Sequence, residues 1–392
     1  MTTNRRRFLK SGAALTALSQ RRVLGANERI RIGGIGLGGR CRYLLNLARQ
    51  EPGVEIVALC DVYEPRLEEA RAKIAPTAEL YVDYRRLLER NDVDAVIIGS
   101  PDHWHVPMTI DAVRAGKDAY VEKPLTKTIE EGPEVERAVR ESRRVVQVGY
   151  QQRSWEHFIE AEKLIAAGKL GDITLVLASW YQNYLGSEPG KYKVDAAKLD
   201  WKRWLGSAPD QPVDALRYHR WRWFWDFGGG HLTDLYSHYC DVIHWYMRAD
   251  TPKHAQADGG VYLLKHLQCP DTINASWDYG RFQVVYNGTL ICRLEGGNLI
   301  FRGAKAMMRI NRDGFAVYPE GVVPAEKTHY PPPLAAMTSA HDGTIDHMRN
   351  FLDCVRNRKE PNAPVQAGVT AARAAHLGNL AYRKGTRVDL VI

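Results

Sequence analysis

The sequence lacks a run of apolar residues long enough to cross a membrane as a helix, so we expect no membrane association in the mature form. Cysteine is also scarce, with six among 392 residues, and no two of them form a CxxC pair. A cysteine-rich zinc site is therefore not expected, and we predict no bound metal. We interpret the cysteines as small buried apolar residues, with one disulfide left open if the protein is exported. They are Cys41, Cys60, Cys240, Cys269, Cys292 and Cys354.

A basic stripe of the kind that binds nucleic acid is missing as well. The formal net charge is +8, but residues 1–26 contribute six Lys or Arg and no acid, which leaves +2 for the rest. We therefore expect no nucleic acid partner. The length and the hydrophobic content of 45% favour two domains of ordinary size.

The basic N-terminus has the pattern of an export address. The run from Asn4 to Lys10 resembles a twin-arginine motif, a short apolar stretch follows, and Leu24-Gly25-Ala26 could end a cleavable signal peptide. We predict a signal peptide over residues 1–26 and a periplasmic enzyme that is exported already folded. The alternative is a plain basic tail on a cytoplasmic protein.

From residue 27 onward, short apolar runs alternate with stretches of helical periodicity. The first helix places Cys41, Leu44, Leu45 and Ala48 at i, i+3, i+4 and i+7. This alternation predicts a doubly wound parallel sheet over residues 27–149, in an α/β fold. The expected strands are residues 29–35, 56–60, 80–82, 95–98, 119–121 and 145–148.

The pattern changes after residue 150. A strand over 172–180 and strand-like runs over 255–318 predict a second, mostly antiparallel sheet, so we assign residues 150–392 to an α+β domain. The aromatic stretch 185–225 is expected to be irregular. The expected helices are residues 155–167, 230–247, 343–357 and 366–380.

A glycine loop follows the first strand. Gly34, Gly36 and Gly39 fit the pattern G-x-G-x-x-G, and Asp61 ends the next strand 22 residues later. This context is typical of a Rossmann dinucleotide site, in which the third glycine lets helix and strand pack closely. We expect the Asp61 carboxylate to accept hydrogen bonds from ribose hydroxyls and to repel a 2′-phosphate, which favours NAD over NADP. The alternative role for Asp61 is a helix N-cap.

Other cofactor-binding candidates come from the ends of the strands, because ligands of such sheets gather there. Glu122 could position the cofactor ribose or Lys123. The remaining candidates are Leu37, Gly38, Arg40, Ser100, Pro101, His105 and Lys123.

Several of these motifs together resemble the Gfo/Idh/MocA family, which includes glucose–fructose oxidoreductase and inositol dehydrogenase. They are the glycine loop, Ser100-Pro101 with His105, Gly116-Lys117, Glu122-Lys123-Pro124, and Gly228-Gly229-Gly230 followed by Asp234 and His238. The resemblance covers nearly all of residues 28–392. It implies a Rossmann domain with an open-faced sheet domain, a sugar or polyol substrate, hydride transfer at a carbinol carbon, and a homo-oligomer, either a dimer or a tetramer.

The resemblance assigns Lys123, Asp234 and His238 to the catalytic site. Asp234 and His238 are four apart on an expected helix, so the carboxylate could orient the imidazole and raise its basicity. We expect His238 to take the hydroxyl proton and Lys123 to donate to the substrate oxygen, with a share of the proton work open to Lys123. The plainer alternatives are a solvated lysine and an ordinary pair of helix residues.

Aromatic residues concentrate near the expected substrate site, with seven of the ten tryptophans between positions 180 and 245. Their rings could stack on sugar faces, or they could serve core and subunit packing. The substrate-binding candidates are Trp104, Lys123, Tyr181, Asn183, Arg222, Trp225, Asp234 and His238.

These observations predict an NAD-dependent oxidoreductase that acts on a sugar, glycoside or polyol. The alternative is an NAD-dependent glycoside hydrolase that oxidises, eliminates, hydrates and reduces, with a tightly bound and internally recycled cofactor. Export favours the alternative, since no pool of NAD is expected outside the cytoplasm. A non-catalytic sugar sensor is a third possibility, which the presence of Lys123, Asp234 and His238 disfavours.

Overall fold

The computed structural model describes residues 29–321 and 330–391. The predicted signal peptide over residues 1–26 lies outside these ranges. Within them, no helix combines the length and the apolar character that a bilayer span requires. All six cysteines are free, and five are buried as expected, but Cys292 is exposed.

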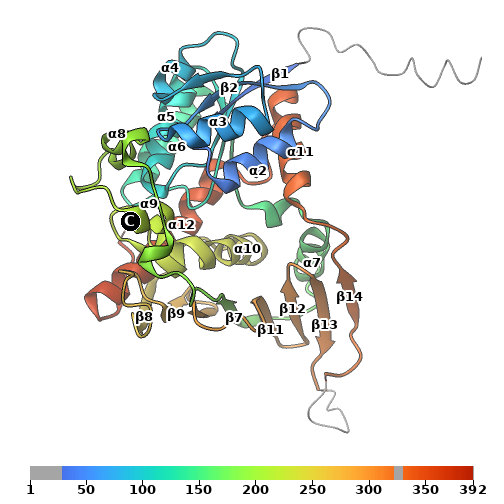
Figure 1. Ribbon diagram of the computed structural model, residues 1–392. Coiled ribbons are helices and arrows are strands. Elements are labelled where there is room, and N and C mark those ends of the chain that lie inside the picture. The colour runs from blue at the N-terminus through green and yellow to red at the C-terminus, as the bar shows by residue number, and fades with distance from the viewer. Residues whose placement is uncertain (1–28, 322–329, 392) are drawn as a thin grey trace, which may run out of the picture.

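The first sheet has six parallel strands in the order β3-β2-β1-β4-β5-β6, which confirms the predicted doubly wound sheet. Its helices flank the strands in the upper part of Figure 1. The strands are β1 (Ile30–Ile35), β2 (Val54–Cys60), β3 (Glu79–Tyr81), β4 (Ala95–Ile98), β5 (Asp118–Val121) and β6 (Val146–Val148). The helices are α2 (Gly39–Ala48), α3 (Glu64–Lys73), α4 (Tyr84–Leu88), α5 (His105–Arg114) and α6 (Glu131–Ser142).

Helix α2 buries the four residues that its periodicity predicted, namely Cys41, Leu44, Leu45 and Ala48. These side chains pack in one cluster with the β1 residues Ile30 and Ile32 and hold the glycine loop between strand and helix.

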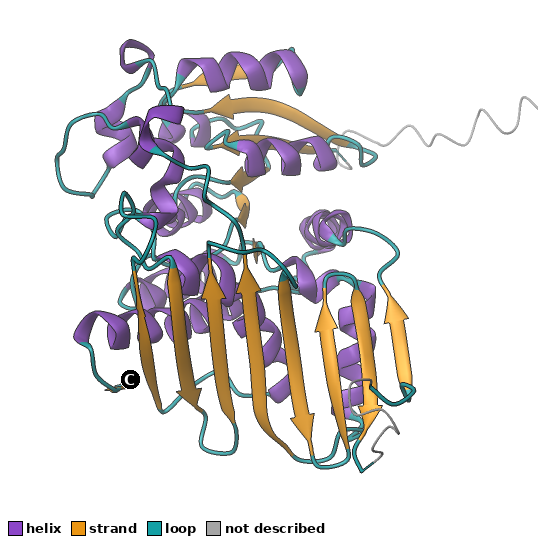
Figure 2. Ribbon diagram, turned by 60° about the horizontal axis from the view of Figure 1, so that its bottom comes forward, coloured by secondary structure: helices purple, strands orange, loops and turns teal. Residues whose placement is uncertain are grey.

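The second sheet has nine strands and is mostly antiparallel, with one parallel pair between β7 and β10. Figure 2 shows helices behind this sheet and no described element over its near face. The strands are β7 (Ile173–Tyr181), β8 (His254–Gly260), β9 (Thr272–Asp278), β10 (Gln283–Thr289), β11 (Gly297–Gly303), β12 (Ala306–Asn311), β13 (Gly314–Pro319), β14 (Ala335–Thr338) and β15 (Val388–Asp389). The predicted open-faced α+β arrangement is confirmed.

Three helices cover the inner face of this sheet, and a fourth returns to the first domain. These are α7 (Glu156–Ala166), α10 (Ser237–Met247), α12 (Val365–Lys384) and α11 (Thr344–Asn357). In α11, Phe351 packs edge-on against Tyr120 of β5, with ring centroids 5.8 Å apart. A segment near the C-terminus thus completes the core of the cofactor domain.

Residues 195–222, here called the strap, leave the second domain and lie against the first. The aromatic stretch was expected to be irregular, but the strap contains the short helices α8 (Trp201–Leu205) and α9 (Ala215–Arg220). Asp200 N donates to Val62 O over 2.9 Å, and Tyr63 forms a β-bridge with Leu199. The strap therefore closes one side of the cleft between the domains.

Candidate active site

The glycine loop joins β1 to α2 at the carboxyl edge of the parallel sheet. Gly36 has φ +76°, and a Cβ there would lie 2.7 Å from the backbone nitrogen of Ser100. Any other residue at position 36 would be strained both in conformation and in contact. The loop therefore needs glycine for its own geometry.

Gly39 differs from Gly36, because a Cβ at Gly39 would meet nothing within 4 Å. The expectation that this third glycine permits helix–strand packing is therefore wrong. Close packing belongs to Gly34 instead, where a Cβ would lie 2.6 Å from Leu45. The space beside Gly38 and Gly39 is an open cradle at the start of α2, where free N–H groups and the helix dipole attract phosphate.

Asp61 lies at the end of β2 and is 5% exposed. Its Oδ2 accepts from Leu37 N over 2.7 Å, and its Oδ1 accepts from Tyr63 N over 2.9 Å. Burial raises the pKa of this carboxyl above its ordinary value. Asp61 thus fixes the glycine loop, and each of its oxygens keeps a second lone pair, since a carboxylate can accept about four hydrogen bonds.

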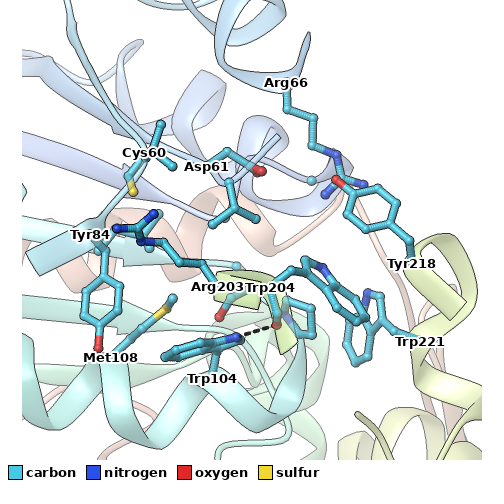
Figure 3. A pocket seen from close by; sticks show the side chains of 18 of the residues that line it. Cys60, Asp61, Arg66, Tyr84, Trp104, Met108, Arg203, Trp204, Tyr218 and Trp221 are labelled. Atoms are coloured by element: carbon cyan, nitrogen blue, oxygen red, sulfur yellow. Dashed lines mark hydrogen bonds between the residues drawn. The ribbon is translucent and has the colours of Figure 1, made fainter. Parts of the chain in front are cut away.

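A cavity of ≈ 350 Å³ opens beside Asp61 and the glycine loop. Figure 3 shows the strap residues Arg203, Trp204, Tyr218 and Trp221 among the side chains that line it, with Tyr218 and Trp221 on the right. The guanidinium of Arg66 lies 4.6 Å from the Tyr218 ring centroid. The flat aromatic walls, the acidic Asp61 and the glycine cradle fit the adenosine and phosphate parts of a dinucleotide.

Arg40 and Glu122 form an ion pair, with Arg40 Nε 2.8 Å from Glu122 Oε1. Burial raises the pKa of Glu122, but Arg40 outweighs it and lowers that pKa overall. Ser100 and Pro101 line the cavity, and Ser100 Oγ is buried without a partner in the described residues. The structure places these candidates around the cofactor cleft.

His105 has a different role from the one expected. It is 1% exposed, and its ring nitrogens lie 2.6 Å from Pro124 O and 2.9 Å from Ser100 O. Both nitrogens face backbone carbonyls, to one of which a neutral imidazole can donate, so His105 lies between the β4 and β5 loops rather than facing a cofactor.

Lys123 reaches across the domain boundary to Asp234. Its Nζ donates to Asp234 Oδ1 over 2.7 Å and to the Asp234 carbonyl oxygen over 2.5 Å. Arg222 Nε donates to the same Oδ1 over 3.0 Å. Burial alone would raise the pKa of Asp234, but the two cations lower it to about 2. The carboxylate is therefore ionised and holds the Lys123 ammonium in place.

The expected contact between Asp234 and His238 is wrong. Residues Leu232–Tyr236 form a π-helical turn that precedes α10, so positions four apart no longer stack as on a regular α-helix. The Asp234 carboxylate turns instead toward Lys123 and Arg222, and His238 Nδ1 has no partner among the described residues.

His238 is instead held by aromatic rings. It stacks on Trp180 with centroids 5.5 Å apart and meets Tyr150 edge-on at 6.2 Å. Burial, and then the charge of Lys123, lowers the pKa of His238 well below its ordinary value. The imidazole is thus neutral, the state in which it can accept a proton.

The substrate candidates separate into two groups. Arg222 binds Asp234, and Trp104 lines the cavity while its Nε1 donates to Trp204 O over 2.9 Å. The others lie elsewhere. Tyr181 bonds Asn287 on the sheet, exposed Asn183 accepts from Leu185 N, and Trp225 stacks on Tyr382 beside a second cavity.

Two residues of the site were not expected from the sequence. Asp102 is 2% exposed, its Oδ1 has no partner within the described ranges, and burial raises its pKa to about 8. Arg312 comes from the turn between β12 and β13. Arg312 lies in no motif, and Asp102 lies between Pro101 and His105 without being one of the residues that carry the resemblance, so the spatial arrangement identifies both.

Taken together, the parallel sheet and the glycine loop define a Rossmann domain, and the buried Lys-Asp-Arg group joins it to the second domain. The description "Oxidoreductase family, NAD-binding Rossmann fold" matches residues 30–150, and "Oxidoreductase family, C-terminal alpha/beta domain" matches residues 161–391. The chain belongs to the Gfo/Idh/MocA family.

Curated relatives are similar over part of their length. Inositol 2-dehydrogenase of Salmonella typhimurium is 31% identical over 180 residues, which cover 44% of this chain and 52% of that protein. Alpha-N-acetylgalactosaminidase of Shewanella oneidensis is 34% identical over 160 residues, or 33% of this chain and 35% of the relative. The chain thus spans about half the length, or less, of these relatives.

Solved structures share the whole fold. Levoglucosan dehydrogenase in complex with NADH and levoglucosan has a TM-score of 0.73 at 17% identity, over 93% of this chain and 100% of that one. The WlbA dehydrogenase from Bordetella pertussis, in complex with NADH and UDP-GlcNAcA, has a TM-score of 0.71 at 19% identity, over 93% and 99%.

Proposed function

We propose that this protein is an NAD-dependent oxidoreductase that acts on a CH–OH group of a sugar, glycoside or polyol. One observation carries the proposal. Lys123 of the cofactor domain binds the carboxylate of Asp234 in the second domain. The neutral imidazole of His238 lies on α10, which follows Asp234.

The residues around the cleft fit the cofactor. Gly36, Gly38 and Gly39 would border the pyrophosphate, with Ser100 and Pro101 nearby. Leu37 differs from this expectation, because it is buried and its N–H is bound to Asp61. Asp61 would face the adenosine ribose, and Arg40 with Glu122 would border the nicotinamide end. Bound NAD supplies the hydride acceptor.

The chain's own residues handle the proton and the developing charge. His238 accepts the hydroxyl proton, because its imidazole is neutral. Lys123 donates a hydrogen bond to the substrate oxygen and stabilises negative charge there. Asp234 and Arg222 fix the position of Lys123. Lys123 Nζ already donates to Asp234 Oδ1, and His238 Nδ1 has no partner among the described residues, so we assign the donor role to Lys123 and the base role to His238.

A substrate screen tests this proposal. The purified protein is mixed with NAD and a panel of inositols, aldoses and anhydrosugars, and NADH formation is followed by absorbance. We expect turnover with at least one CH–OH substrate. NAD binding without turnover on any panel member, confirmed by product mass spectrometry, contradicts the dehydrogenase assignment.

A second candidate is a redox-neutral glycoside hydrolase. The strap over the adenosine cavity favours it, because an enclosed cofactor leaves slowly and is available to be regenerated in each cycle. The similarity to alpha-N-acetylgalactosaminidase points the same way. Release of p-nitrophenol from aryl glycosides without added NAD is the expected result, and its absence from an NAD-loaded preparation removes this candidate.

The sequence also supports a proposal about the location and the domain organisation of the protein. The proposed signal peptide over residues 1–26 would direct folded export to the periplasm, ahead of a cofactor unit (27–149) and a substrate unit (150–392). Fractionation of cells that express wild type or an Arg5-Arg6-Arg7 to Lys variant tests this localisation. Retention of both forms in the cytoplasm contradicts export.

The uncovered face of the second sheet supports a homodimer or homotetramer. Its half-buried apolar residues Leu177, Val285 and Ile300 alternate with buried ones that face the helices. Light scattering coupled to size-exclusion chromatography should give a mass above that of one chain.

A further inference from the structure

Arg312 lies at the edge of the second sheet that faces the cofactor domain. Gly297 of β11 pairs with Trp180 of β7, and the β11–β12 register from Arg302↔Met307 to Leu299↔Ile310 places residue 312 level with Gly297. A Cβ at Gly297 would lie 3.2 Å from the Trp180 ring. A side chain at position 297 would therefore crowd the Trp180 ring, which Arg312 contacts.

The Arg312 guanidinium lies 5.0 Å from the Trp180 ring centroid, and the same ring stacks on His238. Arg312 therefore belongs to the surroundings of the proposed base. After burial, the positive charges of Lys123, Arg312 and Arg40 are the causes that lower the pKa of His238. The turn is anchored on its other side, where His157 Nε2 is 2.8 Å from Asn311 O.

Arg312 has no ion-pair partner in the described part of the chain. Its Nε is buried without a hydrogen bond, and burial lowers the pKa of its guanidinium. Two acids, Asp342 and Glu122, act on the charge of Arg312, and both are already engaged. Asp342 accepts from Thr344 over 2.7 Å and from Tyr43 over 3.0 Å, and Glu122 is paired with Arg40. A guanidinium held this way is stabilised by an anion that it can bind.

The formal charges around the site are unbalanced in the same direction. The cations are Arg40, Lys123, Arg222 and Arg312, whereas the ionised acids are Glu122, Asp234 and Asp342. Asp102 does not correct the excess, because burial raises its pKa to about 8 and keeps it protonated at neutral pH. The surplus favours an anionic ligand.

We propose that Arg312 binds the carboxylate of a sugar acid and makes uronates the preferred substrates of this site. The inference rests on the proposed oxidoreductase function, which it narrows to a substrate class. The planar guanidinium matches a carboxylate with two parallel hydrogen bonds, and the Trp180 ring holds it in one orientation. A cofactor phosphate is the other source of an anion, and the two are distinguished by measurement.

The experiment uses the NAD-loaded protein and two substrate pairs, D-glucuronate with D-glucose and D-galacturonate with D-galactose. Binding is measured by titration calorimetry, which does not depend on turnover, and kcat and KM are measured where NADH forms. The variants are Arg312→Ala, Arg312→Lys and Arg302→Ala. Arg302 is the matched control. It is an exposed arginine at the other end of β11 from Gly297.

We expect wild type to bind at least one acid about 10- to 100-fold more tightly than its neutral partner, the range of a charge-assisted hydrogen-bonded pair. Arg312→Ala should abolish this preference through KM, Arg312→Lys should retain part of it, and Arg302→Ala should match wild type. The Kd for NAD should not change in any variant.

Three results overturn the inference. The first is an equal affinity of wild type for acids and neutral sugars. The second is an acid preference that survives in folded Arg312→Ala, as judged by thermal melting. The third is a weakened Kd for NAD in that variant with the sugar preference intact, which assigns Arg312 to the cofactor phosphates. Acid binding that depends on Arg312 without any NADH formation keeps the inference and contradicts the oxidoreductase function instead.

Discussion

The two ends of the cleft satisfy their polar groups in different ways. At the end that we propose to hold adenosine, here called the adenosine end, there is a cavity of ≈ 350 Å³, an open cradle at Gly38 and Gly39, and hydroxyls of Ser100 and Tyr218 that have no partner in the described chain. At the end that we propose to be catalytic, here called the catalytic end, Lys123 and Asp234 are each about 10% exposed in their side chains and bind each other directly.

This difference separates two tasks. The adenosine end has unused hydrogen-bonding groups and space, so it can accept a ligand without breaking internal contacts. The catalytic end has its charges set before substrate arrives, because Lys123 and Arg222 keep Asp234 ionised while burial keeps His238 neutral. Substitutions at the two ends should therefore change different measured quantities.

The largest effect is expected from Lys123→Ala. The substitution removes the donor to the substrate oxygen, so kcat should fall about 1,000-fold, while the Kd for NAD stays near that of wild type. Steady-state NADH formation and calorimetric NAD titration measure the two quantities. Lys169→Ala, at an exposed lysine, is the control and should be fully active. If Lys123→Ala weakened NAD binding as much as it lowered turnover, the two ends of the cleft would not have separate tasks.

The sequence predicted much of the cofactor domain to which Lys123 belongs, and the reasons are local. Strand and helix periodicity gave the parallel sheet, the buried face of α2 and the glycine loop, because burial on one face imposes a repeat that can be read along the chain. The pairing of Lys123 with Asp234 could not be read this way, since the two residues are 111 positions apart.

The sequence also misplaced some partners. The spacing of Asp234 and His238 predicted a contact that the π-turn at Leu232–Tyr236 prevents, and no residue pattern signals that turn. Trp225 was expected at the substrate, but it packs on Tyr382 instead. A high aromatic content predicts that rings will stack, but it does not predict which group each ring stacks against.

A smaller loss of turnover is expected from His238→Asn, about 100-fold in kcat, because an amide cannot take the hydroxyl proton. The pH profile sharpens this prediction. Burial and Lys123 lower the pKa of His238 well below 6.5, so the imidazole is already unprotonated at that pH. The kcat/KM of wild type should therefore stay level from about pH 8 down to about pH 6.5 and fall only at lower pH. An acid limb centred near pH 6.5 would contradict a buried neutral base.

At the adenosine end, Gly39→Ala should weaken NAD binding about 10-fold without lowering the melting temperature. A Cβ at Gly39 meets no protein atom, so its only obstacle is the bound pyrophosphate. Gly36→Ala is the informative contrast, because its positive φ and its contact with Ser100 should reduce stability by about 1–3 kcal/mol as well. If Gly39→Ala binds NAD normally, the cradle is not the phosphate site.

The smallest effect is expected from Tyr218→Phe in the strap. The Tyr218 hydroxyl is buried and finds no partner among the described residues, yet its ring forms part of the cavity wall. If bound NAD is that partner, removal of the hydroxyl should weaken NAD binding about 3- to 10-fold, the range of one ordinary hydrogen bond, and leave the melting temperature of the cofactor-free protein unchanged or slightly higher.

Tyr246→Phe is the matched control, because the Tyr246 hydroxyl donates to Phe158 O over 2.6 Å inside the second domain. Its loss leaves a buried carbonyl unpaired, so this variant should melt at a lower temperature and bind NAD as wild type does. The reverse pattern in the two tyrosine variants would mean that the adenosine end is structural packing. The strap would then lie beside the cofactor without holding it.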